Sequence, residues 1–100
     1  MGVSYALFEE RRLDPQTGLM LNPTMDDYKL IGALDTPEIE VLFVDVANGV
    51  NNTGVLGLGE PAHVASAAAV ACAVYDALGV PVRSLPITPD KVLKAMGALS

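Results

Sequence analysis

Apolar and polar positions follow helical spacing in some stretches and strand-like alternation in others, with proline and glycine between them. The longest apolar stretch runs from Pro61 to Leu78; proline suits a first helical position, and Gly79 follows as a C-terminal cap. Residues Glu38–Val46 alternate at first and then turn mostly apolar, which predicts the best strand of the chain. The remaining predicted elements are short: helices over Val3–Arg12 and Thr88–Leu99, strands over Leu19–Leu21 and Val82–Leu85, and a turn over Asp14–Gly18.

This order of elements predicts an α+β fold in which residues 1–100 form a single module. We expect a small mixed β-sheet packed with the helix 61–78 and two shorter helices. The buried positions of the best strand are predicted to include Ile39, Val41, Phe43 and Val46. Almost every position of the long helix after His63 is apolar or small, and a helix that is apolar all round is normally buried all round. One hundred residues can scarcely surround it, so we expect a partner subunit or a missing remainder to complete the fold.

The charge balance limits the partners. A net charge of −6 and a pI of about 4.4 argue against nucleic acid and against an anionic membrane, since both need basic patches. No stretch holds the ~20 consecutive apolar residues of a membrane span. Cys72 is the only cysteine, which favours a reducing, cytoplasmic compartment and suits a buried small hydrophobe. His63 is the only histidine, so we expect no metal site built from protein ligands.

The stretch Gly54–Ala62 is the strongest candidate for chemistry, because three glycines precede a single carboxylate, Glu60, at the entrance to the long helix. Glycine lets the backbone approach a ligand closely, and a positioned carboxylate is a reasonable general base. A glycine-rich turn with an exposed glutamate explains the same residues. The dinucleotide fingerprint G-x-G-x-x-A also matches formally, but the predicted strand ends about ten residues before Gly57 instead of directly before it. Glu60 and Pro61 also stand where a pyrophosphate needs free amides and no negative charge.

A succession of short motifs is similar to the C-terminal end of the molybdenum-binding large subunit in the xanthine dehydrogenase / aldehyde oxidase family. The resemblance runs over essentially the whole chain, in order. Its pieces are Tyr5–Glu10, Asp14–Gly18, Leu21–Pro23, Asp27–Lys29, Leu34–Ile39, Gly54–Pro61, Ala73–Ala77 and Leu85–Leu93. Each piece is weak taken singly, and their succession along the chain makes the resemblance specific.

The resemblance implies that Glu60 is the base of a molybdenum hydroxylase, beside a molybdenum–pterin cofactor that Gly57, Leu58 and Gly59 approach. The implied reaction hydroxylates an electron-poor carbon of an aldehyde, purine or N-heterocycle, with water as the oxygen source. Electrons then pass to 2Fe–2S clusters and FAD on partner domains or subunits. Most contacts to cofactor and substrate belong to the remainder of the large subunit, so the isolated chain is expected to be inactive.

One departure from the family pattern concerns charge. Members often carry Ala-Lys or Ser-Lys where this chain has Val55-Leu56, so a polar contact made there in the family is in doubt here. A second interpretation needs no cofactor: the chain is a remnant or structural module that forms a homo-oligomer through its apolar helix. Neither interpretation selects a particular substrate.

Overall fold

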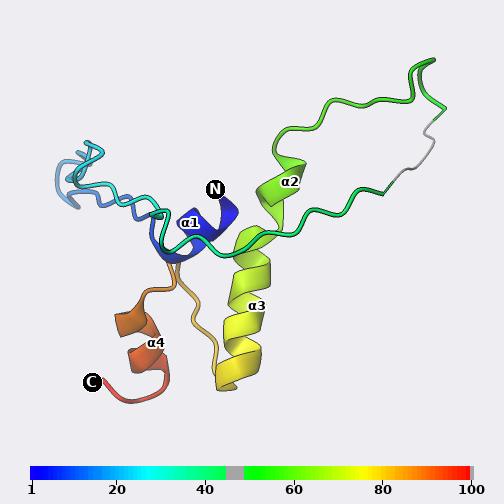
Figure 1. Cartoon of the computed structure of the whole chain (residues 1–100). Helices are drawn as coiled ribbons and strands as arrows, with labels where there is room; N and C mark the ends of the chain where they lie inside the picture. Colours follow the sequence, from blue (N-terminus) through cyan, green and yellow to red (C-terminus); the bar gives the residue numbers. More distant parts are fainter. Residues whose placement is uncertain (45–48, 100) are drawn as a thin grey trace.

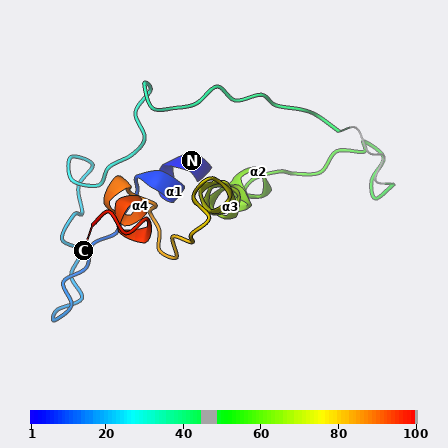
Figure 2. The ribbon, with the colours of Figure 1, turned by 90° about the horizontal axis from the view of Figure 1, so that it is seen from below.

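The structure is a computed structural model that describes residues 1–44 and 49–99, and its regular elements are helices (Figure 1). In chain order the described residues form α1 (Gly2–Leu7), α2 (Pro61–Val64), α3 (Ser66–Leu78) and α4 (Pro89–Ala95). The radius of gyration is 18.0 Å, whereas a compact domain of this length has about 13 Å. The chain is therefore open, and long irregular segments run between and beyond the helices (Figure 2).

The predicted α+β fold is wrong, because the described residues contain no β-strand. A single antiparallel β-bridge joins Leu13 to Met20 among the described residues. The predicted strand Val82–Leu85 forms no β-bridge with them. Of the predicted strand 38–46, residues 38–44 are irregular, and residues 45 and 46 lie outside the described residues. A strand satisfies its backbone by pairing with a neighbour, and none of the described segments pairs with residues 38–44.

The positions predicted to be buried in that strand are exposed instead. Ile39, Val41 and Phe43 are all open to solvent, with Phe43 93% exposed, and Val46 lies outside the described residues. Residues 37–44 run outward from the helices, and residues 49–60 run back to α2 (Figures 1 and 2). Among the described residues, this excursion has no second layer to pack against.

The predicted helix 61–78 is present as two helices, α2 and α3, which meet at Ala65 (φ −79°, ψ −9°). In a continuous helix the carbonyl of His63 would accept the N–H four residues later. Here it accepts the hydroxyl of Tyr5 at 2.7 Å. At the other end, Gly79 takes the left-handed conformation (φ 70°) and its N–H bonds back to the last turn of α3, which confirms the predicted cap.

The two shorter helices begin within one residue of their predicted starts and end early. Helix α1 ends before Arg12, whose N–H donates to the side-chain oxygen of Asn22 at 2.9 Å. Helix α4 ends before Gly97, which takes a φ of 74°, so the predicted extension to Leu99 is not helical. The left-handed glycine ends the helical pattern after α4. Helix α1 ends at Leu7, and the Arg12 contact lies in the irregular chain beyond it.

The small core lies around α1, which packs against α3. Ser4, Ala6 and Ile87 are among the buried residues. The N–H of Ile87 donates to the carbonyl of Ala6 at 2.7 Å, and the hydroxyl of Ser4 accepts from the N–H of Ile31 at 3.0 Å. Helix α1 thus gathers two distant segments of the chain beside α3.

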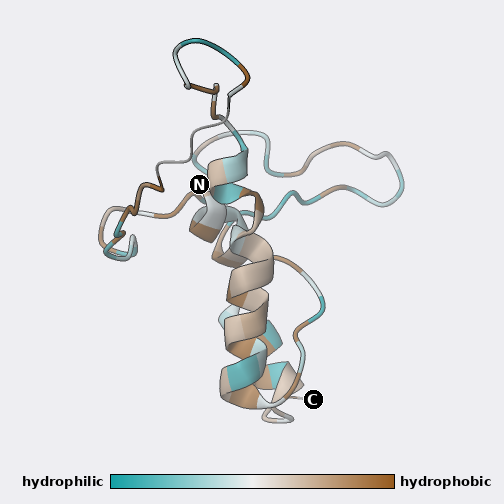
Figure 3. Ribbon diagram, turned by 90° about the vertical axis from the view of Figure 1, so that its right-hand side faces the viewer, coloured by the Kyte–Doolittle hydropathy of each residue, from teal (hydrophilic) through white to brown (hydrophobic). Residues whose placement is uncertain are grey.

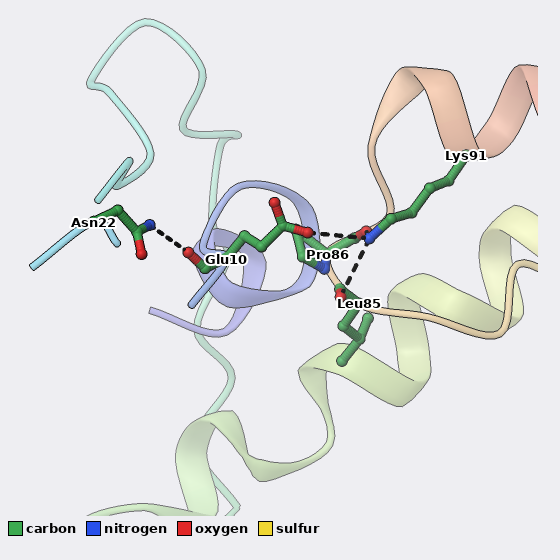
Figure 4. Close-up of polar contacts among 5 residues, drawn as sticks. All are labelled: Glu10, Asn22, Leu85, Pro86 and Lys91. Atoms are coloured by element: carbon green, nitrogen blue, oxygen red, sulfur yellow. Dashed lines mark hydrogen bonds and ion pairs between the residues drawn. The ribbon is translucent and has the colours of Figure 1, made fainter. Parts of the chain in front are cut away.

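A group of polar contacts fastens α4 and the chain near residue 22 to the region after α1 (Figure 4). The ammonium group of Lys91 donates to the carbonyls of Pro86 at 2.9 Å and Leu85 at 3.3 Å. The same group stands 3.6 Å from a carboxylate oxygen of Glu10. The side-chain amide of Asn22 donates to the carbonyl of Glu10 at 2.7 Å. Segments far apart in sequence are therefore joined mainly by hydrogen bonds to backbone.

The sequence predicted that the long helix is buried all round, and this prediction is wrong. No residue of α3 is buried, and Cys72, predicted to be buried, is exposed. Apolar colour runs along most of α3 in Figure 3. By length and composition the run Pro61–Leu78 passes the criterion for a membrane-crossing helix, which apolar core helices of soluble proteins pass as well. The composition of α3 suits a buried helix, and the described residues cover it only in part, where α1 packs against it.

Candidate functional site

Glu60 stands where the excursion of residues 49–60 returns to the helices. Its backbone forms the start of α2: the carbonyl of Glu60 accepts the N–H groups of His63 at 2.9 Å and Val64 at 3.2 Å. Its side chain makes no capping hydrogen bond and has no partner among the described residues. The residue is exposed. The backbone of Glu60 is thus fixed by the helix, while its carboxylate is left available to a group from outside.

The three glycines before Glu60 differ in whether the backbone conformation requires a residue without a side chain. Gly54 has a φ of 68°, a conformation that side chains rarely adopt. Gly57 and Gly59 have no such backbone requirement, and a Cβ at either position would meet nothing within 4 Å. The N–H groups of residues 57–59 make no backbone hydrogen bond in the described chain. Nothing in the described part of the chain requires glycine at positions 57 and 59, and both leave backbone open for close approach by another group.

His63 follows Glu60 by three residues but belongs to the junction with α1. Its ring meets the ring of Tyr5 edge to face, with centroids 6.2 Å apart and planes at 68°. A cavity of about 300 Å³ is lined by residues 1–4, by His63 with its neighbours Ala62 and Ser66, and by four residues between Ile31 and Ile39, and Glu60 is not part of its lining. The structure therefore gives His63 a packing role at an internal junction and does not place it with Glu60 around one cavity.

Two anchors of the site were not predicted from the sequence. The hydroxyl of Tyr5 donates a hydrogen bond to the carbonyl of His63. Gly2 allows α1 to lie directly on Ser66, because a Cβ at Gly2 would overlap the side chain of Ser66. A Gly-x-x-Tyr spacing is too common to signal such contacts. These anchors fix the start of α3 and thereby the helical end of the loop that carries Glu60.

The rest of the described chain offers no cage for a metal ion. Within residues 1–44 and 49–99 no group of three or more histidine, cysteine, aspartate and glutamate side chains could hold one. Cys72 lies exposed on α3.

Comparison with known proteins finds relatives of the chain, although no protein-family model matches it. It is 39% identical over 92 residues to the xanthine dehydrogenase molybdenum-binding subunit of Escherichia coli O157:H7, covering 92% of this chain and 12% of that protein. It is 38% identical over 94 residues to the aldehyde oxidoreductase molybdenum-binding subunit of Escherichia coli K12, covering 93% of this chain and 13% of that protein. The chain thus spans about one eighth of the length of these relatives.

A solved structure repeats the open shape. The chain resembles the crystal structure of quinoline 2-oxidoreductase from Pseudomonas putida 86 with a TM-score of 0.81 and 28% identity. The match covers 99% of this chain and 13% of the other. An open arrangement of this kind therefore occurs as a small part of a much longer folded chain.

Proposed function

Because this chain belongs to the xanthine dehydrogenase and aldehyde oxidoreductase family, as a homologue of one segment of its molybdenum-binding subunits, we propose that it serves as the C-terminal part of a molybdenum hydroxylase. In this role it contributes Glu60 as the catalytic base. The substrate is an electron-poor carbon of an aldehyde, purine or N-heterocycle, and water supplies the oxygen. The observation that carries the proposal is an unpartnered carboxylate at a fixed backbone position, directly after an open glycine loop.

The proton step falls to the carboxylate oxygens of Glu60. They accept the proton of the oxygen nucleophile as it attacks the substrate carbon, and they return it to solvent afterwards. General-base catalysis of this kind contributes about 10²- to 10⁴-fold to the rate. The exposed position of Glu60 in this chain leaves both oxygens free for that exchange.

The residues present fit a molybdenum–pterin group as one wall of its site. Gly57 and Gly59 have open space on the side where a Cβ would stand, and the backbone N–H groups of residues 57–59 have no backbone acceptor in the described chain. These groups would meet the cofactor from one side, with Leu58 between them. When bound, the cofactor supplies the acceptor for the two electrons of the oxidation.

The assembly proposed here extends beyond the chain. The relatives are named as subunits, which supports a complex with the remainder of the molybdenum-binding subunit. We assign the onward electron transfer to 2Fe–2S and FAD groups on partner domains or subunits, in a cytoplasmic enzyme. The isolated chain is inactive under this proposal, because it holds only one wall of the site.

The test replaces the homologous segment of the Escherichia coli aldehyde oxidoreductase subunit with this chain and assays aldehyde oxidation by the assembled enzyme. Glu60→Gln keeps the size and removes the proton acceptor, so turnover should fall by about 10²- to 10⁴-fold. Asp26→Asn, a matched loss of an exposed carboxylate without a partner, should leave turnover unchanged. Wild-type turnover by the Glu60→Gln chimera contradicts the assignment of the base.

A second candidate function is favoured by the exposure of α3. An unburied apolar helix can associate with a second copy of itself, so the chain could act as a structural module without cofactor. Sedimentation of the isolated chain over a range of concentrations tests this function. A concentration-dependent dimer supports it, and a monomer at every concentration contradicts it.

A further inference from the structure

The hydroxyl of Tyr5, in α1, contacts the short helix that begins after Glu60. It donates to the carbonyl of His63 at 2.7 Å, across a separation of 58 residues in the sequence. We propose that Tyr5 is a positioning residue for the catalytic base, because this hydrogen bond sets the direction of α2 and with it the direction of the Glu60 carboxylate. The inference rests on the proposed function, since it takes Glu60 as the base.

The backbone of Glu60 belongs to the same rigid unit as α2. Glu60 has helical backbone angles (φ −62°, ψ −31°), and its carbonyl accepts the N–H groups of His63 and Val64. The Cα–Cβ bond of a helical residue has a fixed direction relative to the helix axis. Any rotation of α2 therefore turns the start of the Glu60 side chain with it.

Helix α2 is too short to keep its own direction. It is a single turn of four residues, and none of them is buried. One helical turn is costly to form alone, because several backbone angles are fixed for the first hydrogen bond. The irregular residues 49–59 precede α2, and the break at Ala65 separates it from α3. The orientation of α2 must therefore be set by a contact with another part of the protein.

Helix α1 supplies that contact. Among the described residues, no other hydrogen bond reaches α2 from a distant segment, and the rings of Tyr5 and His63 add an edge-to-face contact. Helix α1 is itself fixed against the start of α3. A Cβ at Gly2 would overlap Ser66 and would stand 3.4 Å from the carbonyl oxygen of His63. Tyr5 thus links the helix of the base to a closely packed part of the chain.

The same hydrogen bond explains why α2 does not continue the line of α3. Seen along α3, α2 lies to one side of that helix (Figure 2). The carbonyl of His63, which a continuous helix uses for its own hydrogen bonds, accepts the Tyr5 hydroxyl instead. Without this hydroxyl the carbonyl is free for helical pairing, so α2 can align with α3 and carry Glu60 to a different place.

A small rotation of α2 matters because proton transfer depends on geometry. A catalytic group must stand within about 0.5 Å and 10–20° of its productive position. A misplacement of about 1 Å can lower a rate by about 10²-fold. Loss of the Tyr5 hydroxyl should therefore lower kcat and leave KM nearly unchanged, because Glu60 is assigned to the proton step and not to substrate binding.

The test uses the assembled chimera, the Escherichia coli aldehyde oxidoreductase subunit that carries this chain. Tyr5→Phe keeps the ring and removes the hydroxyl, so kcat for aldehyde oxidation should fall by about 10- to 100-fold. The KM for aldehyde and the molybdenum content should stay within about twofold of those of the unsubstituted chimera. Tyr28→Phe is the matched control, because it removes a hydroxyl that donates to Glu9 at 3.0 Å, and its kcat should not change.

A double variant shows whether Tyr5 acts through Glu60. In the Glu60→Gln background, Tyr5→Phe should cause no further loss of kcat, because the group that Tyr5 positions has already been removed. A merely structural role would lower kcat by the same factor in both backgrounds, and that result overturns the proposal. Unchanged kcat for Tyr5→Phe beside a large loss for Glu60→Gln overturns the positioning role and keeps the proposed function. Full turnover by Glu60→Gln overturns the proposed function itself.

Resonances of the isolated chain give a second measurement, which does not require turnover. Tyr5→Phe should move the carbonyl carbon of His63 and the amide protons of His63 and Val64 upfield, because the hydrogen bonds at α2 weaken. Tyr28→Phe should leave these resonances in place. If they also stay in place in Tyr5→Phe, the hydroxyl does not hold α2, and the positioning role is overturned.

Discussion

At the scale of single residues, glycine serves opposite purposes at the two ends of the candidate site. Gly2 lies against Ser66 so closely that any Cβ would overlap both the hydroxyl and the Cβ of that serine. Gly57 and Gly59 lie in open space with ordinary backbone angles. The first glycine is needed by the fold of this chain, whereas the other two leave room for something that the chain does not contain.

This contrast predicts that the same substitution destabilises the isolated chain at one position and has no effect at the other. Gly2→Ala should destabilise the packing of α1 on α3 by about 1–3 kcal/mol, because the Cβ of Ser66 cannot rotate away. Gly57→Ala should leave the stability unchanged within about 0.5 kcal/mol. Thermal unfolding followed by far-ultraviolet circular dichroism measures both. A larger loss for Gly57→Ala than for Gly2→Ala contradicts the assignment of the two roles.

The predicted turn at Asp14–Gly18 gives a pH-dependent signal. The backbone N–H groups of Gln16 and Thr17 donate to the carboxylate of Asp14 and hold the pKa of Asp14 below its ordinary value. Because the pKa of Asp14 is lowered, its ionised carboxylate stabilises the turn at pH values above the ordinary aspartate pKa. That stabilisation is lost as the pH falls through the lower value of the folded state.

Amide chemical shifts of Gln16 and Thr17 should therefore titrate below about pH 4, with a midpoint under that of a model aspartate. Asp14→Asn removes the titrating group and should remove this pH dependence. A midpoint at or above the model value would show that the two N–H groups do not stabilise the ionised carboxylate.

At the scale of elements, the contacts of Lys91 decide how α4 is held. Its ammonium group donates to two backbone carbonyls and stands 3.6 Å from Glu10, whose side chain is 48% exposed. Hydrogen bonds from a charged donor are worth about 1.5–3 kcal/mol, whereas an exposed ion pair is worth about 0–1 kcal/mol. The carbonyl contacts should therefore dominate over the ion pair.

Lys91→Met keeps the apolar stem and removes the donor, so it should lower the stability of the isolated chain by about 1–2 kcal/mol. Glu10→Gln removes only the ion pair and should cost at most about 0.5 kcal/mol. Thermal unfolding compares the two variants, and loss of α4 amide protection locates the effect. A greater cost for Glu10→Gln would reverse the ranking of the two interactions.

The sequence predicted local signals better than long-range pairing. The left-handed Gly79, the start of α4 at Pro89 and the turn at Asp14 depend on neighbours in sequence, and all three are present. The sheet depended on a partner strand for residues 38–44, and no pattern in the chain could show that such a partner is lacking. The break at Ala65 escaped prediction for a similar reason, since it coincides with a hydroxyl from Tyr5.

The candidate site shows the same division. The residue types in Gly57–Glu60 already indicated a carboxylate beside open backbone, and the structure places them together at the entrance to α2. The packing of His63 on Tyr5 could not be predicted, because the two residues are far apart in sequence. A base role for Glu60 stays a prediction that the chimera tests.

At the scale of the whole molecule, an open shape and an exposed apolar helix have one explanation. The radius of gyration of 18.0 Å exceeds the ~13 Å of a compact domain of this length. Residues 38–44 are exposed, and α3 is covered only in part by the described chain. Burial of apolar surface contributes about 25 cal/mol per Å², and this gain is what usually stabilises a helix of this composition. Helix α1 supplies part of that stabilisation to α3, and the rest is available only when other protein packs on the helix.

The reactivity of Cys72, the single cysteine of the chain, measures whether other protein covers α3. Cys72 lies on α3 and is exposed in the isolated chain, so it should react with a maleimide at about the rate of a small free thiol. In the assembled chimera the same thiol should react about 100-fold more slowly, because alkylation then requires α3 to lose its cover. Mass spectrometry of the peptide that contains Cys72 separates this reaction from that of other cysteines. Equal rates in the two states would show that this face of α3 stays open to solvent after assembly, and the apolar helix would then need another explanation.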